Sequence, residues 1–424
     1  MAAISSGKKD FINTFLLVIL YAAGFYCLQL FLFKATFLQT LPDELNLLHW
    51  DSGWYCTLSR VGYIYDPTGV NNLAFFPLFP LIWHIAHVGV WGMACLNVLF
   101  FATGISILDN LFKPGTQNKI LWLSMPAVYF CFIPYSEAVF FLLTTITFYG
   151  IRNNKKLLVW ISLFLLSLTR PTGVLLAPSF LAMTLLSAGN KRWYKSLFSY
   201  LTVYLSPMVL GTGLFIWYEY LKSGVWFVFF DIEKKYWGHV LNIPMLPFNN
   251  NYNQSLSWIS AIAVFIGFFS FLFLLNRFFK WLFKNNIQDD LLILSCSYLF
   301  MSLIAIIFYN PTWSGNTTNI AGIYRYTLMN PFFYVFLNYF TNVARYSWKN
   351  YLFVFFLANV VWASFGAYVH IQYFLLFTAS TIIIFMYMLH ANKKLTWPVM
   401  ILTALNIFFQ VQFFQQFISN IFPD

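Results

Sequence analysis

Residues 11–33 read FINTFLLVILYAAGFYCLQLFLF, an apolar run that is preceded by Lys8 and Lys9. An α-helix needs about 20 predominantly apolar residues to cross the hydrocarbon core of a bilayer. This run is long enough to do so, and it is longer than the apolar core of a signal peptide. Because it also lacks a small-residue cleavage site, we expect it to remain in the protein as a membrane helix.

The composition of the whole chain agrees with an integral membrane protein. Of its 424 residues, 60% are hydrophobic and 9% are charged, whereas soluble domains carry roughly 25% charged residues. So few charges cannot cover a surface that faces water, which excludes a soluble fold. Aromatic residues make up 22% of the chain, and they suit lipid contact and the aromatic belts at membrane surfaces.

The net charge of +11 is not evidence for nucleic-acid binding. Lys and Arg occur in short clusters between apolar runs, which is typical of cytoplasmic loops. We therefore expect no nucleic-acid partner. The five cysteines show no paired spacing, so neither a disulfide framework nor a zinc site is predicted.

The basic clusters also predict an orientation. If Lys8 and Lys9 are cytoplasmic, the first helix delivers the first loop (residues 34–74) to the outer side. Alternation through the later clusters then predicts about 11–13 transmembrane helices. We expect an all-α polytopic protein, with residues 1–424 as a single integral membrane domain and the N-terminus in the cytoplasm.

Three segments depart from simple crossings. Residues 120–152 and 157–191 each predict a hairpin with arms of about 13–17 residues, too short to span easily. We expect their turns, near Pro134 and Arg170, to lie below the outer surface beside a water-filled cavity. The prolines of FFPLFP at 75–80 predict a short or re-entrant helix before the second crossing.

The first loop is polar and aromatic where it leads into the second crossing. It reads NLLHWDSGWYCTLSRVGYIYDPTGVNNLAFFPLFP over residues 46–80. Four of its apolar residues recur at helical spacing, namely Trp50, Trp54, Leu58 and Val61. This pattern predicts an amphipathic helix at the membrane interface that directs a polar residue into a cavity. Asp51 either caps this helix or acts in chemistry, and the two roles are compatible.

Further charged residues stand in apolar surroundings. Glu137 in FIPYSEAVFF is unfavourable in a membrane unless it faces a cavity or a partner. Arg170 in LTRPTGVLL either extends its head to the interface or pairs with Glu137 or a ligand anion. Arg325 in NIAGIYRYTLMNPFF begins a helix on the predicted outer side.

The lid segment (residues 222–254) is a second long outer loop, and it is either an ordinary solvated loop or a lid. It carries Asp231, Lys235 and Trp237. Arg325 and Lys235 together would pair strongly with a phosphate. A cation-lined cavity with a carboxylate at its mouth fits a lipid-phosphate donor and an acceptor hydroxyl, with the carboxylate as general base and the cations stabilising the departing phosphate.

Five segments, taken in order, resemble those of a known family. HWDSGWY with GYIYDP and NLAFFPLFPL, then PYSEAVFFLL, LTRPTG, YWGHVLNIP and YRYTLMNPFF, are similar to the PIG-V-like mannosyltransferases. This family contains GPI mannosyltransferase 2 and its prokaryotic relatives and belongs to the GT-C class of membrane glycosyltransferases. The likeness extends from His49 to Phe333, and its first segment is the most specific.

The resemblance implies transfer of mannose from a polyprenyl-phosphate-mannose donor, with inversion, on the periplasmic or lumenal side. It gives Asp51 the role of general base. We expect the substrate cavity to contain His49, Trp50, Arg60, Glu137, Arg170, Lys235, Trp237 and Arg325. The acceptor is then a lipid, a glycan or a protein, and the membrane is a bacterial inner membrane or the endoplasmic reticulum. No metal or cofactor is predicted, although a divalent ion held by the carboxylates stays open.

Two other classes of protein have similar compositions. A lipid or solute transporter also needs many helices and intramembrane charges, but it favours polar residues at the midplane and repeated halves. The chain shows no such repeat. A non-catalytic subunit of a transferase complex would keep the fold and tolerate the loss of Asp51.

Overall fold

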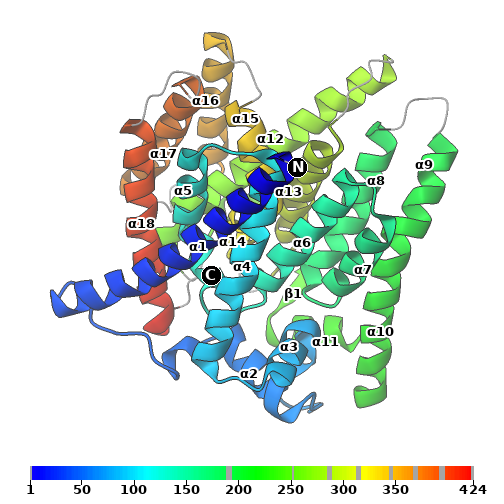
Figure 1. Cartoon of the computed structure of the whole chain (residues 1–424). Coiled ribbons are helices and arrows are strands. Elements are labelled where there is room, and N and C mark those ends of the chain that lie inside the picture. Colours follow the sequence, from blue (N-terminus) through cyan, green and yellow to red (C-terminus); the bar gives the residue numbers. More distant parts are fainter. Residues whose placement is uncertain are drawn as a thin grey trace.

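The computed structural model describes residues 2–187, 193–250, 253–283, 289–311, 317–342, 347–365, 371–390 and 397–421. Within these ranges the chain is largely helical (Figure 1), and its short strands form two two-stranded pairs. The predicted all-α class is therefore confirmed for this part of the chain. The basic residues Lys191, Arg192, Arg345, Lys393 and Lys394 lie outside the described ranges.

Six helical segments of the described chain are long and apolar enough to cross a membrane: residues 7–34, 90–112, 194–223, 254–282, 290–308 and 399–418. They make the protein a multi-pass membrane protein. The first of them lies within α1 (Ala2–Lys34), where the membrane helix was predicted. Leu20 and Phe31 of α1 are 69% and 67% exposed, as expected of side chains that face lipid. Shorter apolar helices lie between these spans, and the larger number of crossings predicted from the basic clusters is not confirmed.

The predicted short elements are present. The first loop contains α2 (Asp51–Val61), and α3 (Leu78–Ala86) stands before the long helix α4 (Val90–Phe112). The first hairpin consists of α5 (Thr116–Ser124), a 3₁₀ helix (Pro126–Cys131) and α6 (Glu137–Arg152). The second consists of α7 (Lys156–Ser167), a 3₁₀ helix (Pro171–Leu175) and α8 (Leu176–Ser187). Pro126 and Pro171 each begin a 3₁₀ turn, because the proline ring fixes φ and removes an N–H donor.

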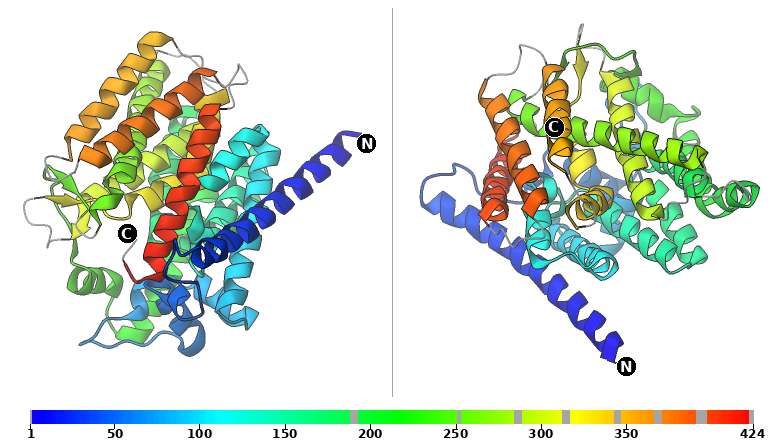
Figure 2. Two further views of the ribbon diagram at one scale, coloured as in Figure 1. Left: turned by 90° about the vertical axis from the view of Figure 1, so that its left-hand side faces the viewer. Right: turned by 90° about the horizontal axis from the view of Figure 1, so that it is seen from above.

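The remaining helices complete the bundle. They are α9 (Trp193–Ser199), α10 (Ser206–Ser223), α11 (Val228–Tyr236), α12 (Ser257–Leu282), α13 (Asp290–Phe308), α14 (Ile323–Leu328), α15 (Pro331–Asn342), α16 (Trp348–Ala363), α17 (Ile371–His390) and α18 (Trp397–Ile418). A π-helical turn (Tyr200–Leu205) joins α9 to α10. Figure 2 shows α1 running along the outside of the bundle with its N-terminal end projecting from it.

A buried amide holds three distant segments together. The Gln410 side chain on α18 donates hydrogen bonds of 3.2 Å to the carbonyls of Leu123 and Met125, where α5 ends. The Tyr21 hydroxyl on α1 donates to Gln410 Oε1 at 2.8 Å. Because the last carbonyls of a helix lack partners within it, a buried helix end needs such a donor. Gln410 thus satisfies the end of α5 and joins it to α1 and α18.

The first loop and the lid segment gather at one end of the bundle, where Figure 1 shows α2, α3 and α11 together. Leu73 and Ala74 of the first loop form a small apolar core with Val228 and Ile232 of α11. The lid also pairs with the segment before α14: β1 (His239–Leu241) runs antiparallel to β3 (Tyr309–Pro311), and β2 (Phe248–Asn249) runs parallel to β4 (Thr318–Asn319). The segment 222–254 is thus packed against the first loop.

A glycine lets α2 approach the turn before it. A Cβ on Gly53 would lie 2.6 Å from the Leu48 carbonyl oxygen, so the backbone would have to move. We expect Gly53→Ala to lower the midpoint of thermal unfolding in detergent. Gly213→Ala in α10 is the control, because no atom lies within 4 Å of the Cβ that it adds. That change should stabilise the helix by up to about 1 kcal/mol. Equal midpoints for the two variants would contradict the close approach.

Candidate functional site

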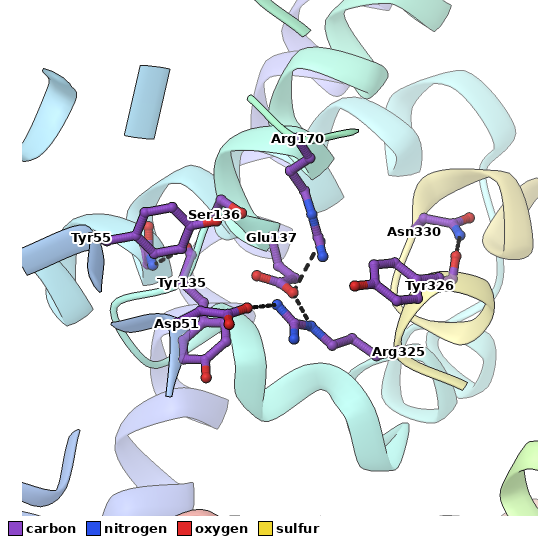
Figure 3. A network of polar contacts seen from close by, with 10 residues as sticks. Asp51, Tyr55, Tyr135, Ser136, Glu137, Arg170, Arg325, Tyr326 and Asn330 are labelled. Carbon is purple, nitrogen blue, oxygen red and sulfur yellow. Dashed lines mark hydrogen bonds and ion pairs between the residues drawn. The ribbon is translucent and has the colours of Figure 1, made fainter. Parts of the chain in front are cut away.

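Four charged side chains from four separate segments meet in one network (Figure 3). Arg325 Nη2 lies 3.0 Å from Asp51 Oδ2, and Arg325 Nε donates a short hydrogen bond to Glu137 Oε1. Arg170 Nη1 lies 2.9 Å from the same Glu137 oxygen. The ion pairs therefore run from Asp51 through Arg325 and Glu137 to Arg170. The structure brings these four predicted residues together.

The local backbone explains where each carboxylate lies. Asp51 is the first residue of α2 and follows Trp50, whose φ of 57° and ψ of −131° are rare for a residue with a side chain. The side chain of Asp51 binds Arg325. The N-terminus of α2, with Trp50 at the N-cap position, has no side-chain cap. Glu137 is the first residue of α6, where the partial positive charge of the helix N-terminus favours a carboxylate.

The two arginines also sit at helix starts. Arg170 is extended, with φ of −157° and ψ of 153°, because the ring of Pro171 disfavours helical geometry in the residue before it. Arg325 lies on α14, which follows Gly322 at φ of 77°, a conformation that glycine adopts without strain. Breaks between short helices therefore place both guanidinium groups.

Burial differs sharply within the network. The Glu137 side chain is 2% exposed and those of Arg170 and Arg325 are 8% exposed, whereas Asp51 is 35% exposed. Two carboxylates balance two guanidinium groups, so the network as a whole carries no net charge. Because an unpaired buried ion is strongly unfavourable, this balance is a condition for the fold. Arg170 is paired with Glu137, and the alternative in which it extends to the interface is wrong.

Aromatic rings hold the guanidinium groups in place. The rings of Phe130 and Tyr135 lie 4.7 and 4.8 Å from the Arg325 guanidinium carbon. The Tyr326 ring lies 5.1 Å from that of Arg170. Such contacts attract cations through the negative face of the ring and restrict their rotation. These rings were not predicted as site residues, although Tyr326 directly follows Arg325 in YRY and Tyr135 lies two residues before Glu137 in PYSE.

Polar atoms at the network have capacity for a ligand. A guanidinium has five N–H donors, and the ion pairs use Nε and Nη2 of Arg325 and Nη1 of Arg170. Glu137 Oε2 is buried without a hydrogen-bond partner among the described residues. Buried polar atoms normally have partners, so this oxygen favours a polar ligand or bound water beside it.

An apolar cavity of about 100 Å³ lies among α12, α15, α18 and the end of α14. Its walls include Trp258 and Phe269 of α12, Phe336 of α15 and Leu402 of α18. Leu328 also lines it, one turn after Arg325 on α14. The walls come from many elements, so no single stretch of sequence predicts this cavity.

Two other predicted residues, His49 and Trp237, lie close to the network but are separated from it by other side chains. His49 donates from Nδ1 to the Phe417 carbonyl at 2.9 Å, because a carbonyl can only accept. The Trp237 ring of the lid lies 6.3 Å from that of Phe75, which lies 5.4 Å from Tyr55. The Tyr55 hydroxyl shares a 3.1 Å hydrogen bond with Ser136, beside Glu137. The lid thus reaches the network through a row of aromatic rings.

Lys235 and Arg60 are placed elsewhere. Lys235 Nζ donates to the Pro67 carbonyl of the first loop at 2.8 Å, so it holds the lid to that loop. Arg60 follows Asp51 on α2 by about two and a half helical turns, which puts it on the opposite face of the helix. Lys235 therefore contacts the first loop, whereas Arg325 contacts Asp51 and Glu137.

Among the described residues, no group of three or more His, Cys, Asp or Glu side chains could hold a metal ion. The oxygens of Asp51 and Glu137 that face the network contact guanidinium groups instead. The five cysteines are free thiols, three of them buried. The charged groups that meet at the site are two carboxylates and two guanidinium groups.

Comparison of the chain with protein-family models, with curated proteins and with solved structures finds no match. The likeness of its motifs to the PIG-V-like mannosyltransferases therefore stays a prediction. The geometry of the charged network and its surroundings has to support any function on its own.

The charge balance predicts opposite effects for one substitution at two glutamates. Glu137→Gln leaves two buried guanidinium groups with one carboxylate, and we expect it to lower stability by about 3–5 kcal/mol. Glu219 on α10 is also fully buried, but neither of its oxygens has a hydrogen-bond partner in the described chain. Glu219→Gln removes a carboxyl group without breaking an ion pair, so stability should stay equal or rise. Thermal unfolding in detergent measures both, and a similar loss in the two variants would contradict the balance.

Proposed function

We propose that the protein is a membrane glycosyltransferase that moves a hexose from a polyprenyl-phosphate sugar donor to an acceptor hydroxyl, with inversion. By the resemblance of its motifs, the hexose is mannose and the site faces the periplasm or the lumen. The observation that carries the proposal is the position of Asp51. It is the one carboxylate of the network that reaches solvent, and a buried guanidinium holds it.

Asp51 suits the role of general base. Arg325 contacts its Oδ2, which leaves Oδ1 to accept a proton from the acceptor hydroxyl. As that proton leaves, the acceptor oxygen attacks the anomeric carbon from the side opposite the phosphate. The bond between carbon and phosphate oxygen breaks, and the phosphate departs with the electron pair. A positioned general base contributes about 10²–10⁴-fold to such a reaction.

The arginines suit the departing phosphate. The donors that Arg325 and Arg170 do not spend on carboxylates are available to phosphate oxygens, with which guanidinium forms short, strong hydrogen bonds. Because the site has little water around these groups, their attraction for the growing negative charge is larger than in solution. A phosphate at Arg325 would also weaken the pull of this guanidinium on Asp51, which leaves the base freer to take a proton.

The apolar cavity suits the start of the polyprenyl chain. Leu328 lines the cavity three residues after Arg325 on α14, so we expect a tail bound there to direct its phosphate head toward the guanidinium. Burial of each methylene contributes roughly 0.8 kcal/mol. A lipid tail would therefore add substantial affinity to a small charged head, and the acceptor would approach from the side of Asp51.

Asp51→Asn should abolish transfer and leave donor binding intact, and because Asp51 is 35% exposed, against 2% for Glu137, we expect it to lower stability less than Glu137→Gln does. The change is nearly isosteric and removes the base, so we expect turnover to fall by about 10²–10⁴-fold. The measurement is transfer from radiolabelled polyprenyl-phosphate-mannose by purified protein in detergent, with donor binding measured separately. Asp231→Asn is the matched control, because Asp231 is an exposed carboxylate on α11.

The outcomes separate the alternatives. Equal turnover in the wild type and Asp51→Asn would exclude Asp51 as the base. Binding of the donor without turnover by the wild type, with every class of acceptor tried, would favour a non-catalytic subunit. A well-folded wild type that does not bind the donor would favour another lipid-phosphate donor or a transporter.

Filling the apolar cavity should discriminate against long donors. Ile262 on α12 is partly buried and lines the cavity. Ile262→Trp should weaken binding of a long polyprenyl donor and leave a donor with a short alkyl chain unaffected, because only the long chain needs the cavity. The test is the inhibition constant of each unlabelled donor as a competitor of the radiolabelled donor in the transfer assay. Equal losses for both would show that the cavity does not hold the tail.

A further inference from the structure

A second hollow, of about 290 Å³, lies at the end of the bundle that carries the first loop. It is lined by Ser59, Arg60, Trp83, His84, His87 and Val88. Arg60 is on α2, on the face opposite Asp51 and roughly 14 Å along the helix from it. The hollow is therefore separate from the charged network of Figure 3.

The two histidines are positioned by the backbone. His84 Nδ1 lies 2.7 Å from the Ser59 carbonyl, so it carries the proton and donates it. The rings of His84 and His87 lie 5.7 Å apart. His87 ends α3 with φ of 50°, and the Trp83 indole donates to the Val88 carbonyl at 2.9 Å, which fixes the turn.

The charges of the lining favour an anion over a cation. Arg60 is permanently charged, both histidines add charge when protonated, and none of the lining residues is acidic. Glu44 Oε1 lies 3.8 Å from the Cβ position of Gly89, but Glu44 does not line the hollow. Two histidines could bind a metal ion, but the guanidinium beside them would repel it.

Apolar side chains flank the hollow on the protein surface. Leu81 and Ile85 on α3 are 51% and 66% exposed, and Val61 at the end of α2 is 60% exposed. His84 lies between Leu81 and Ile85 on the same helical face. In a multi-pass membrane protein, apolar side chains beside cationic ones suit the boundary between headgroups and acyl chains.

We propose that this hollow binds a phosphate monoester or diester. Arg60 supplies the bidentate fork that matches phosphate oxygens, and the Nε2 atoms of His84 and His87 supply further donors when protonated. The phosphate belongs either to the headgroup of a lipid, whose chains contact Leu81 and Ile85, or to a small soluble molecule. The inference does not depend on the proposed transferase reaction, because it uses no residue of the charged network.

The test uses the full-length protein in a neutral detergent and three probes: dioctanoyl phosphatidate, dioctanoylglycerol and inorganic phosphate. Binding is measured for wild type, Arg60→Gln, the double variant His84→Gln/His87→Gln, and Arg152→Gln. Arg152 is an exposed arginine at the end of α6, and it controls for the loss of one positive charge. We expect Arg60→Gln to weaken phosphatidate binding by on the order of tenfold, and Arg152→Gln to leave it unchanged.

The outcomes distinguish a lipid headgroup from a soluble phosphate, and both from the absence of a phosphate site. Binding of phosphatidate alone, lost in Arg60→Gln, supports a lipid headgroup. Similar binding of phosphatidate and inorganic phosphate supports a soluble phosphate. The proposal is overturned if neither phosphatidate nor inorganic phosphate binds, or if binding is unchanged in Arg60→Gln and in the double histidine variant. It is also overturned if dioctanoylglycerol, which has no phosphate, binds as well as phosphatidate. Asp51→Asn should bind phosphatidate like the wild type, so failure of the transferase proposal is distinguishable from failure of this one.

Discussion

The double ion pair of Glu137 with Arg170 and Arg325 is the constraint on which the centre of the structure depends. A guanidinium buried among apolar side chains is unfavourable unless a carboxylate lies beside it. One oxygen of Glu137 meets this condition for two arginines, and Asp51 supplies the second negative charge. The starts of α2, α6 and α14 and the turn before α8 must therefore converge on a single point.

Short helices make this convergence possible. A helix that crosses a membrane without interruption carries its polar ends to the two surfaces. In both hairpins the arms stop early, at 3₁₀ turns that begin with Pro126 and Pro171. The charged residues at these interruptions consequently lie inside the protein, among Phe130, Tyr135 and Tyr326. Aromatic side chains, which face lipid elsewhere in the protein, orient the guanidinium groups at this site.

Sequence reasoning predicted the membrane class, the two hairpins, the helix after Trp50, and the four residues of the network. It succeeded because a charge in an apolar segment is visible without coordinates, and such a charge needs a cavity or a partner. It did not place Arg60 or Lys235, because both lie in polar segments between the membrane spans, where a charged side chain is solvated in many orientations. Whether Arg60 shares a face with Asp51 depends on where α2 begins, and Trp50, included in the predicted apolar stripe, stands outside the helix. The apolar cavity and the number of crossings depend on how distant helices pack, which local patterns do not record.

The pairing of β2 with β4 connects the lid segment to the charged network through a short stretch of main chain. The Ile320 amide, directly after β4, donates to the Asn249 carbonyl in the lid segment at 2.9 Å, and α14 begins three residues later at Ile323. Arg325 is thus only a short stretch of backbone away from a strand that the lid holds. A displacement of residues 248–249 would therefore act through this backbone on the guanidinium that holds Asp51. The position of the segment and the geometry of the ion pairs are in this way linked by one short piece of main chain.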